Sequence, residues 1–272
     1  MVSTQPSASS SRAYPTTPEA MESLSQALRS SLEKLRPPPK ITISQWADRE
    51  RRLSPEASSE PGVWHTDRAA YQRGVMDAIS DPRIETVVFM SASQVGKTEI
   101  LLNTIGYFVQ HDPSPILLVL PTLSMGQAFS KDRLAPMIRD TPSLRGRVQD
   151  ARSRDSNNTV MHKNFSGGRI SIVGANSAAG LSSLPIRVVL IDECDRAPVS
   201  AGSEGDPILL AQRRSATFHN RKMVLTSSPT IAGNSRIEAA YEESDQRRYH
   251  VPCGDCGEMD YMKWANVRWQ EG

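Results

Sequence analysis

The chain of 272 residues carries 32 Lys and Arg against 30 Asp and Glu, a formal net charge of +2, and 38% of its residues are hydrophobic. This composition is ordinary for a soluble protein, and so small a net charge does not by itself indicate a nucleic-acid partner. No apolar run approaches the roughly 18 residues that cross a bilayer, and the N-terminus lacks an apolar signal core. We therefore expect a cytosolic protein with no membrane partner, built as one large domain with appendages.

The first 40 residues differ in composition from the rest. Residues 1–16 are rich in Ser, Thr and Pro, so we expect a disordered tail there. Residues 17–40 predict a helix and a proline-rich linker, because Thr17 can cap a helix, Pro18 suits its first turn and the prolines at 37–39 stop it. The large apolar residues of this helix recur at helical spacing, at Met21, Leu24, Leu28, Leu32 and Leu35. Such a stripe needs a surface to cover it, on the chain's own domain or on a partner protein.

Short apolar runs with β-branched residues alternate with helical patterns from residue 84 onward. We expect strands at 84–90, 116–120, 169–173, 187–191 and 222–227, with helices after most of them. Near-continuous apolar strands separated by helices are typical of a mainly parallel sheet with helices on both faces. The sequence therefore predicts an α/β domain over residues 41–250.

A candidate phosphate-binding loop lies between the first of these strands and the next helix. It reads SASQVGKT: Ser91, Ala92, Ser93, Gln94, Val95, Gly96, Lys97 and Thr98. Backbone N–H groups and the helix N-terminus would face an anion there, Lys97 can reach the β- and γ-phosphates of ATP, and Thr98 can hold Mg²⁺. The usual pattern has glycine where Ser91 stands, a position that often needs a permissive backbone. The alternative interpretation is a structural turn.

An acidic pair follows the strand expected at 187–191. Asp192 and Glu193 come about 95 residues after the loop, and parallel strands would put both carboxylates at the sheet edge that carries the phosphate site. Asp192 would hold Mg²⁺ through water, and Glu193 would orient and deprotonate the attacking water, as a hydrolase requires. The alternative is a polar strand end that is acidic by chance.

Two weaker elements agree with a nucleotide site. Gln72, on a predicted helix before the loop, has an amide that can pair with both a donor and an acceptor on adenine, although a solvated glutamine is an equal alternative. Thr226, Ser227 and Ser228 end another apolar strand, and their hydroxyls could sense the γ-phosphate or the attacking water. The alternative for these three is a strand-ending turn at Pro229.

Four longer stretches carry a family resemblance: YQRGVMDAISDP, the loop continued to residue 142, GANSAAGLSSLPIRVVLIDECDRAP and SSPTIAGNSRIEAAYEESDQRRYHVPCGDCG. They resemble the large subunit of phage DNA-packaging terminases of the lambda (GpA-like) type, over roughly residues 41–272. The resemblance implies an ATPase motor domain of the additional-strand, conserved-glutamate P-loop class. It assigns the residues named above to that family's phosphate loop, acidic pair, adenine-contacting glutamine and coupling motif, and it makes Ser91 a common variant.

One departure from the family concerns an arginine. Some terminases carry a charge-stabilising arginine finger inside the phosphate loop, at the place where Ser93 stands here. A finger for this chain would have to come from elsewhere, and the catalytic candidates are Arg213 and Arg214, with Arg196 after the acidic pair. The alternative for each is a plain surface arginine.

A second departure is length. Family large subunits continue into a nuclease domain, and we expect no nuclease activity here because too little chain follows residue 250. Residues 251–272 are expected to begin a linker or zinc-ribbon-like segment, in which Cys253 and Cys256 have zinc-ligand spacing and His250 is a weak third candidate. Bound zinc is not expected with so few ligands. We expect Cys194 to be a buried structural thiol.

Residues 139–169 hold a basic bias of seven side chains against three acidic ones. The basic residues are Arg139, Arg145, Arg147, Arg152, Arg154, Lys163 and Arg169. Without interleaved aromatic residues, this segment suits contact with the phosphates of double-stranded DNA better than contact with bases, although a solvated face is an equal alternative.

By the resemblance, ATP hydrolysis would drive double-stranded DNA into a viral procapsid in the host cytoplasm. The chain would work in a homo-oligomeric ring, with the portal protein and the small terminase subunit as partners, and residues 17–36 are the candidate contact for the small subunit. The alternatives are a helicase-like DNA translocase and a nucleotide-binding assembly module with little turnover.

Overall fold

The computed structural model describes residues 17–35, 39–148, 158–182 and 185–269. The chain divides into two units, Met1–Lys40 and Ile41–Gly272. The first contains helix α1 (Pro18–Leu35), which confirms the helix expected there. The tail at 1–16 and residues 36–38 of the linker lie outside the described residues. None of the described helices is both long and apolar enough to cross a bilayer.

A six-stranded sheet forms the centre of the second unit, in the order β3-β8-β7-β4-β6-β5. The five expected strands are present and mutually parallel: β3 (Thr86–Met90), β4 (Ile116–Leu120), β6 (Gly168–Gly174), β7 (Val188–Asp192) and β8 (Lys222–Ser227). An antiparallel edge strand, β5 (His162–Phe165), was not predicted. The prediction missed β5 because its sequence, HKNF, has no apolar run.

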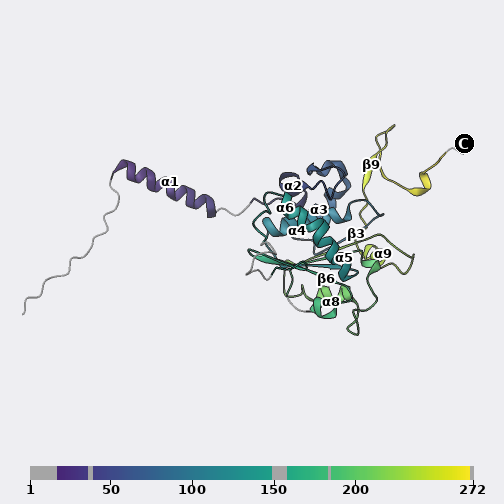
Figure 1. Ribbon diagram of the computed structural model, residues 1–272. Coiled ribbons are helices and arrows are strands. Elements are labelled where there is room, and N and C mark those ends of the chain that lie inside the picture. The colour runs from purple at the N-terminus through teal and green to yellow at the C-terminus, as the bar shows by residue number, and fades with distance from the viewer. Residues whose placement is uncertain (1–16, 36–38, 149–157, 183–184, 270–272) are drawn as a thin grey trace, which may run out of the picture. The chain divides into compact units, whose positions relative to one another are not determined.

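Helices cover both faces of the sheet, as expected (Figure 1). One face carries α2 (Ile43–Glu50), α3 (Tyr71–Ser80), α4 (Lys97–Gln110), α5 (Leu123–Ala128), the π-helical turn η2 (Phe129–Leu134) and α6 (Ala135–Asp140). The other carries α7 (Ala178–Ser182), α8 (Pro207–Arg213) and α9 (Arg236–Glu242). Smaller elements are the pairs β1 (Arg52–Leu53) with β2 (Gly62–Val63) and β9 (His250–Pro252) with β10 (Met259–Tyr261), and the 3-10 turns η1 (Thr66–Ala69), η3 (Cys194–Arg196) and η4 (Trp264–Asn266).

The two faces explain why the central strands are apolar throughout. Successive residues of a strand point to opposite faces, so Ile116 and Leu118 enter the core under α4 while Leu117 and Val119 enter the core under α8. Strand β7 divides in the same way. Because neither face of β4 and β7 meets water, residues 116–120 and 188–191 are apolar throughout, and the first polar residue of β7 is its last, Asp192.

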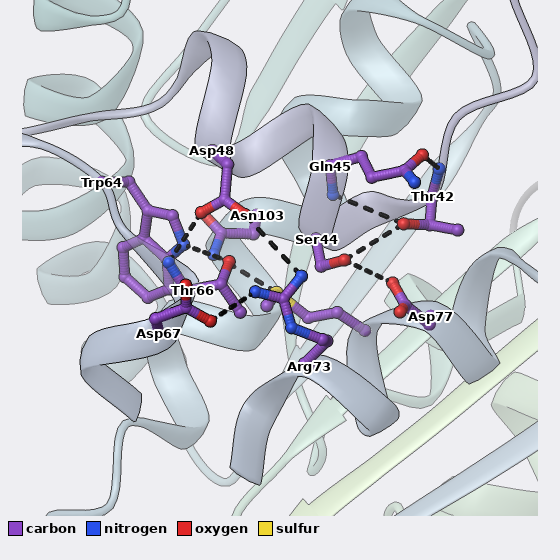
Figure 2. Close-up of polar contacts among 11 residues, drawn as sticks. Thr42, Ser44, Gln45, Asp48, Trp64, Thr66, Asp67, Arg73, Asp77 and Asn103 are labelled. Carbon is purple, nitrogen blue, oxygen red and sulfur yellow. Dashed lines mark hydrogen bonds and ion pairs between the residues drawn. The ribbon is translucent and has the colours of Figure 1, made fainter. Parts of the chain in front are cut away.

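A polar network joins α2, η1 and α3 above α4 (Figure 2). Ser44 Oγ donates to Asp77 Oδ1 at 2.5 Å, the N–H of Thr66 donates to Asp48 Oδ1 at 2.6 Å, and Arg73 Nη2 lies 2.7 Å from Asp67 Oδ1. The network ties down both ends of α3, the helix that carries Gln72.

Close packing also fixes α2 on α4. Trp46 is fully buried, donates through Nε1 to Gln110 Oε1 at 2.8 Å, and lies against Gly106, where an added Cβ would be 2.1 Å from the indole ring. Only glycine allows this approach.

Replacement of Gly106 by alanine should therefore lower the free energy of unfolding by about 1–3 kcal/mol, because the added methyl group overpacks this contact. Urea denaturation measures the change. Gly74→Ala is the matched control, since Gly74 also lies in a helix but an added Cβ meets nothing within 4 Å. The control should be neutral or raise stability by up to about 1 kcal/mol, and equal losses in both variants would contradict the packing argument.

Candidate nucleotide site

Three parallel strands bring the predicted site residues to one edge of the sheet. β8 lies between β3 and β7, and the last residues pair Met90 with Ser227 and Asp192 with Thr226. The phosphate loop after β3, the acidic pair at the end of β7 and the hydroxyls at the end of β8 therefore meet. In this arrangement β8 is the additional strand between the strand of the phosphate loop and the strand of the acidic pair.

The loop backbone explains why serine can replace the first glycine. Among the described residues of the loop, positive φ occurs at Gln94 (63°) and Gly96 (78°) and not at Ser91. Ser91 instead extends β3, since its N–H donates to the carbonyl of Ser227 at 3.2 Å. Glycine suits position 96 because of this positive φ, and a Cβ there would also lie 2.3 Å from Gln72 Nε2 and displace that amide.

Lys97 begins α4 and holds its ammonium group inside the site. Its Nζ donates to the carbonyl of Ala92 at 3.0 Å and to Ser228 Oγ at 2.8 Å, and it lies 3.7 Å from Glu193 Oε1. The side chain is only 6% exposed. Thr98 follows it in the first turn of α4, where free backbone N–H groups favour an anion.

Asp192 is buried at the end of β7. Its Oδ1 accepts from Thr226 Oγ1 at 2.7 Å and from the N–H of Glu193 at 3.1 Å. Burial raises the pKa of Asp192, and the hydrogen bond from Thr226 opposes that rise. Thr226 thus supports the carboxylate, a contact that the sequence could not reveal.

Glu193 adopts a left-handed backbone conformation, with φ 50° and ψ 50°. A non-glycine residue in this region costs about 1–3 kcal/mol, and such strain is concentrated at functional sites. Its carboxylate lies between two cations, with Oε1 3.7 Å from Lys97 Nζ and Oε2 3.7 Å from Arg196 Nε.

Gln72 lies against the phosphate loop from the side of α3. Its Nε2 donates to the carbonyl of Val95 at 3.1 Å, and the hydroxyl of Tyr71 donates to the same carbonyl at 3.0 Å. The structure therefore gives Gln72 a contact with the loop backbone, and its Oε1 is left as a free acceptor. Tyr71 was missed by sequence reasoning, and its position next to Gln72 was the only signal.

Buried polar atoms without partners surround the loop. Within the described part of the chain these include Gln72 Oε1, Ser91 Oγ and Glu193 Oε2. Because buried polar groups are normally hydrogen-bonded, such a cluster fits a polar ligand held at the loop. A nucleotide with Mg²⁺ supplies donors, acceptors and water, and its metal needs few protein ligands. Thr98 and Asp192 are the residues able to hold that metal.

Comparison with known proteins decides the family. A profile described as the phage terminase large subunit gpA, ATPase domain, matches residues 58–272. The chain belongs to this family. It is 32% identical over 242 residues to the terminase large subunit of Enterobacteria phage P21, and 30% identical over 241 residues to that of Escherichia phage lambda. Each alignment covers 88% of this chain and 37% of the relative, so the chain spans little more than a third of their length.

The fold agrees with a terminase ATPase domain. The crystal structure of the HK97 bacteriophage large terminase superposes with a TM-score of 0.57 over 77% of this chain and 42% of that protein. The sequences are only 12% identical, so this likeness supports the fold alone. The α/β P-loop fold expected from the sequence is therefore confirmed.

The terminase domain places Arg213 and Arg214 away from the phosphate loop. The carbonyl of Arg214 accepts from the N–H of Ile186 at 3.1 Å, just before β7 begins, and Arg213 lines a surface pocket with Arg221, just before β8 begins. Both arginines thus lie at the amino end of the strands, opposite the site. A finger role for these two arginines stays a prediction, and their place at the amino end of the strands does not support it within one chain.

The cysteines of the terminase domain fall in two environments. Cys194 is buried, and burial raises the pKa of its thiol to about 12, which fits the structural thiol that we expected. Cys253 and Cys256 are exposed at the β9–β10 hairpin. Among the described residues, no group of three His, Cys, Asp or Glu side chains is arranged to hold a metal, and His250 Nδ1 instead lies 3.0 Å from the carbonyl of Arg248.

Proposed function

We propose that this chain hydrolyses ATP and couples hydrolysis to the movement of double-stranded DNA into a viral procapsid. One observation carries the proposal: Lys97, Asp192 and Glu193 converge at the carboxyl edge of the sheet, beside a loop surrounded by unpartnered buried polar atoms. We assign no nuclease step to these residues.

In the proposed reaction, Glu193 orients a water molecule and accepts its proton as the water oxygen attacks the γ-phosphorus. The bond from that phosphorus to the β–γ bridging oxygen breaks, and ADP leaves with the electron pair. Lys97 exchanges its contacts with Ala92 and Ser228 for phosphate oxygens. Mg²⁺, when bound, neutralises phosphate charge, and Thr98 and Asp192 would hold it, Asp192 through water.

When Lys97 leaves Ser228 for a phosphate oxygen, the change can pass from the nucleotide site to the rest of the fold. Ser228 Oγ accepts from Lys97 at 2.8 Å, and the next residues reach Asp195, whose Oδ2 accepts from the N–H of Thr230 at 2.9 Å. Asp195 Oδ1 also accepts from the N–H of Ile237, at 2.8 Å, in the first turn of α9. A change at Lys97 could therefore reach α9 through these contacts.

Steady-state ATP turnover, with and without linear duplex DNA, tests the proposal. We expect turnover by the chain alone and an increase with DNA of any sequence. Nucleotide binding without turnover under both conditions would support the assembly module instead, and stimulation by single strands alone would support a helicase-like translocase.

The proposed DNA contact is the basic segment at 139–169. Arg139, Arg145 and Arg147 are exposed there. Arg139 is paired with Glu56 and Asp140, whereas the Nε atoms of Arg145 and Arg147 donate only to backbone carbonyls. Arg152 and Arg154 lie outside the described residues. Among the described residues no carboxylate lies within ion-pair distance of Arg145 or Arg147, so these two are the best candidates to hold phosphates.

Charge reversal of both, Arg145→Glu with Arg147→Glu, should weaken duplex DNA binding at least about tenfold in 50 mM salt and reduce the salt slope by about two. Fluorescence anisotropy over a salt series measures both quantities. Reversal of Arg68 and Arg83, two exposed arginines outside this segment, is the control. Equal losses in the two double variants, or binding that does not depend on salt, would contradict phosphate contact by this segment.

We propose that the stripe on α1 binds the small terminase subunit. Deletion of residues 1–40 should abolish that binding and leave kcat for ATP within about twofold, because every proposed site residue lies in the second unit. Pull-down with purified small subunit and ATPase assays measure the two effects. Leu24→Glu with Leu28→Glu should reproduce the binding loss, while Ser23→Glu with Ser30→Glu, on the opposite side of the helix, should not. Insolubility or lost ATPase activity after deletion would instead indicate that the helix docks on its own domain.

We further propose a ring of such chains that pushes DNA through the portal protein in the host cytoplasm. This part rests on the family to which the chain belongs. Cross-linking in the presence of DNA and ATP, followed by mass measurement, tests the ring.

A further inference from the structure

Among the residues assigned to the proposed reaction, Lys97 is the one cationic side chain that faces the charge on the transferred phosphoryl group. In P-loop enzymes an arginine usually contributes to the charge on the transferred phosphoryl group, yet Ser93 occupies the loop position and Arg213 and Arg214 lie at the opposite edge. In the part of the chain that the structure describes, two arginines contact the turn that follows the acidic pair, Arg196 and Arg236.

The guanidinium of Arg236 binds the backbone of this turn. Its Nη1 donates to the carbonyls of Cys194 at 3.5 Å and Ala197 at 3.3 Å, and its Nη2 donates to the carbonyl of Pro198 at 2.9 Å and lies 3.7 Å from Asp206 Oδ2. A guanidinium with this many backbone contacts cannot leave without exposing buried carbonyls. Arg236 is therefore part of the scaffold.

The backbone of Arg196 is held by a hydrogen bond, whereas its side chain is mostly exposed. Its N–H donates to the carbonyl of Glu193 at 2.9 Å, and the neighbouring Asp195 is held by Thr230 and Ile237. The side chain is 65% exposed, and its Nε lies 3.7 Å from Glu193 Oε2. That separation is too long for a hydrogen bond, so the contact with Glu193 does not fix the guanidinium of Arg196.

We propose that Arg196 is the charge-stabilising arginine of this ATPase, acting within its own chain. Without nucleotide it lies beside Glu193, on the carboxylate oxygen opposite the one that faces Lys97. When ATP occupies the loop, the guanidinium of Arg196 turns to the γ-phosphate. Glu193 is then free to accept the proton of water. Arg196 forms no covalent bond; it stabilises charge as the bond to the leaving ADP breaks. The inference rests on the proposed ATP hydrolysis and names a further residue for it.

The decisive variant is Arg196→Ala, with Arg68→Ala as the matched control. Arg68 is 70% exposed and paired with Glu60, and it lies outside the site. We expect Arg196→Ala to lower kcat about 1,000-fold with ADP affinity changed less than about threefold, and to abolish the extra affinity that aluminium fluoride gives to ADP binding. Arg68→Ala should change none of these. Arg196→Lys should restore only a small part of kcat, because lysine lacks the planar fork.

Titration with ADP, with and without aluminium fluoride, separates the possible outcomes. If the wild-type chain neither binds ADP nor hydrolyses ATP, the proposed function fails and the inference fails with it. If the wild type is active and Arg196→Ala keeps its kcat and its response to fluoride, the inference alone is overturned. Turnover recovered on mixing Arg196→Ala with Lys97→Ala would place the arginine in a neighbouring chain and overturn the assignment within one chain.

Discussion

Replacement of Glu193 by glutamine should lower kcat for ATP hydrolysis by about 100- to 10,000-fold while ATP still binds. A general base contributes this much to rate, and glutamine keeps the shape of glutamate but cannot accept the proton of water. The carboxylate lies at the site, between Lys97 and Arg196, and its Oε2 is buried without a hydrogen-bond partner. Single-turnover kinetics with ATP and titration with a non-hydrolysable analogue measure rate and affinity separately.

Glu60→Gln is the control for this prediction. Glu60 is a 63% exposed glutamate paired with Arg68, and its replacement should leave kcat within about twofold. Turnover of Glu193→Gln close to that of the wild type would show that another group takes the proton. Loss of ATP binding together with turnover would show that Glu193 is needed to bind ATP.

Replacement of Lys97 by alanine should weaken ATP binding at least about 100-fold and abolish measurable turnover. The ammonium group is buried beside the loop and makes two hydrogen bonds, to Ala92 and Ser228, that phosphate oxygens can replace. Two charge-assisted hydrogen bonds are worth about 3–6 kcal/mol together, which is more than enough for a 100-fold change. The rise in melting temperature that ATP gives to the wild type should disappear as well.

Lys131→Ala is the matched control, because Lys131 is an exposed lysine on η2. It should keep both the affinity for ATP and the thermal shift. A Lys97→Ala protein that still gains stability from ATP would refute the phosphate contact, and a protein whose nucleotide-free melting temperature collapses would show that Lys97 mainly supports the fold.

Hydrophobic pattern was enough to predict most of the central sheet. The five parallel strands follow from apolar runs, because apolar residues of each strand pack into the cores on the two faces of the sheet. The edge strand β5 escaped prediction because it has no apolar run, and the pairs β1–β2 and β9–β10 escaped it because strands of two or three residues show no period. The order of the strands, with β8 between β3 and β7, was likewise not written in any single segment.

Motif and context together were enough to predict which residues meet at the site. Strand, turn and helix around Lys97, and an apolar strand ending in Asp192 and Glu193, require a shared edge when the strands are parallel. Glycine is usual in place of Ser91 because that position often needs a permissive backbone. In the structure Ser91 does not need one, because positive φ occurs at Gln94 and Gly96.

The fold class and the convergence of the loop with the acidic pair could be predicted from local periodicity and motif spacing. The family could be predicted from the resemblance that four longer stretches of the chain carry. The positions of the candidate arginines became clear only in the folded chain. Arg213 lies on α8 at the amino end of the strands, and Arg196 lies beside Glu193 at the carboxyl end. These two positions are 17 residues apart in the chain, and only the return of the backbone across the sheet between them puts them at opposite edges.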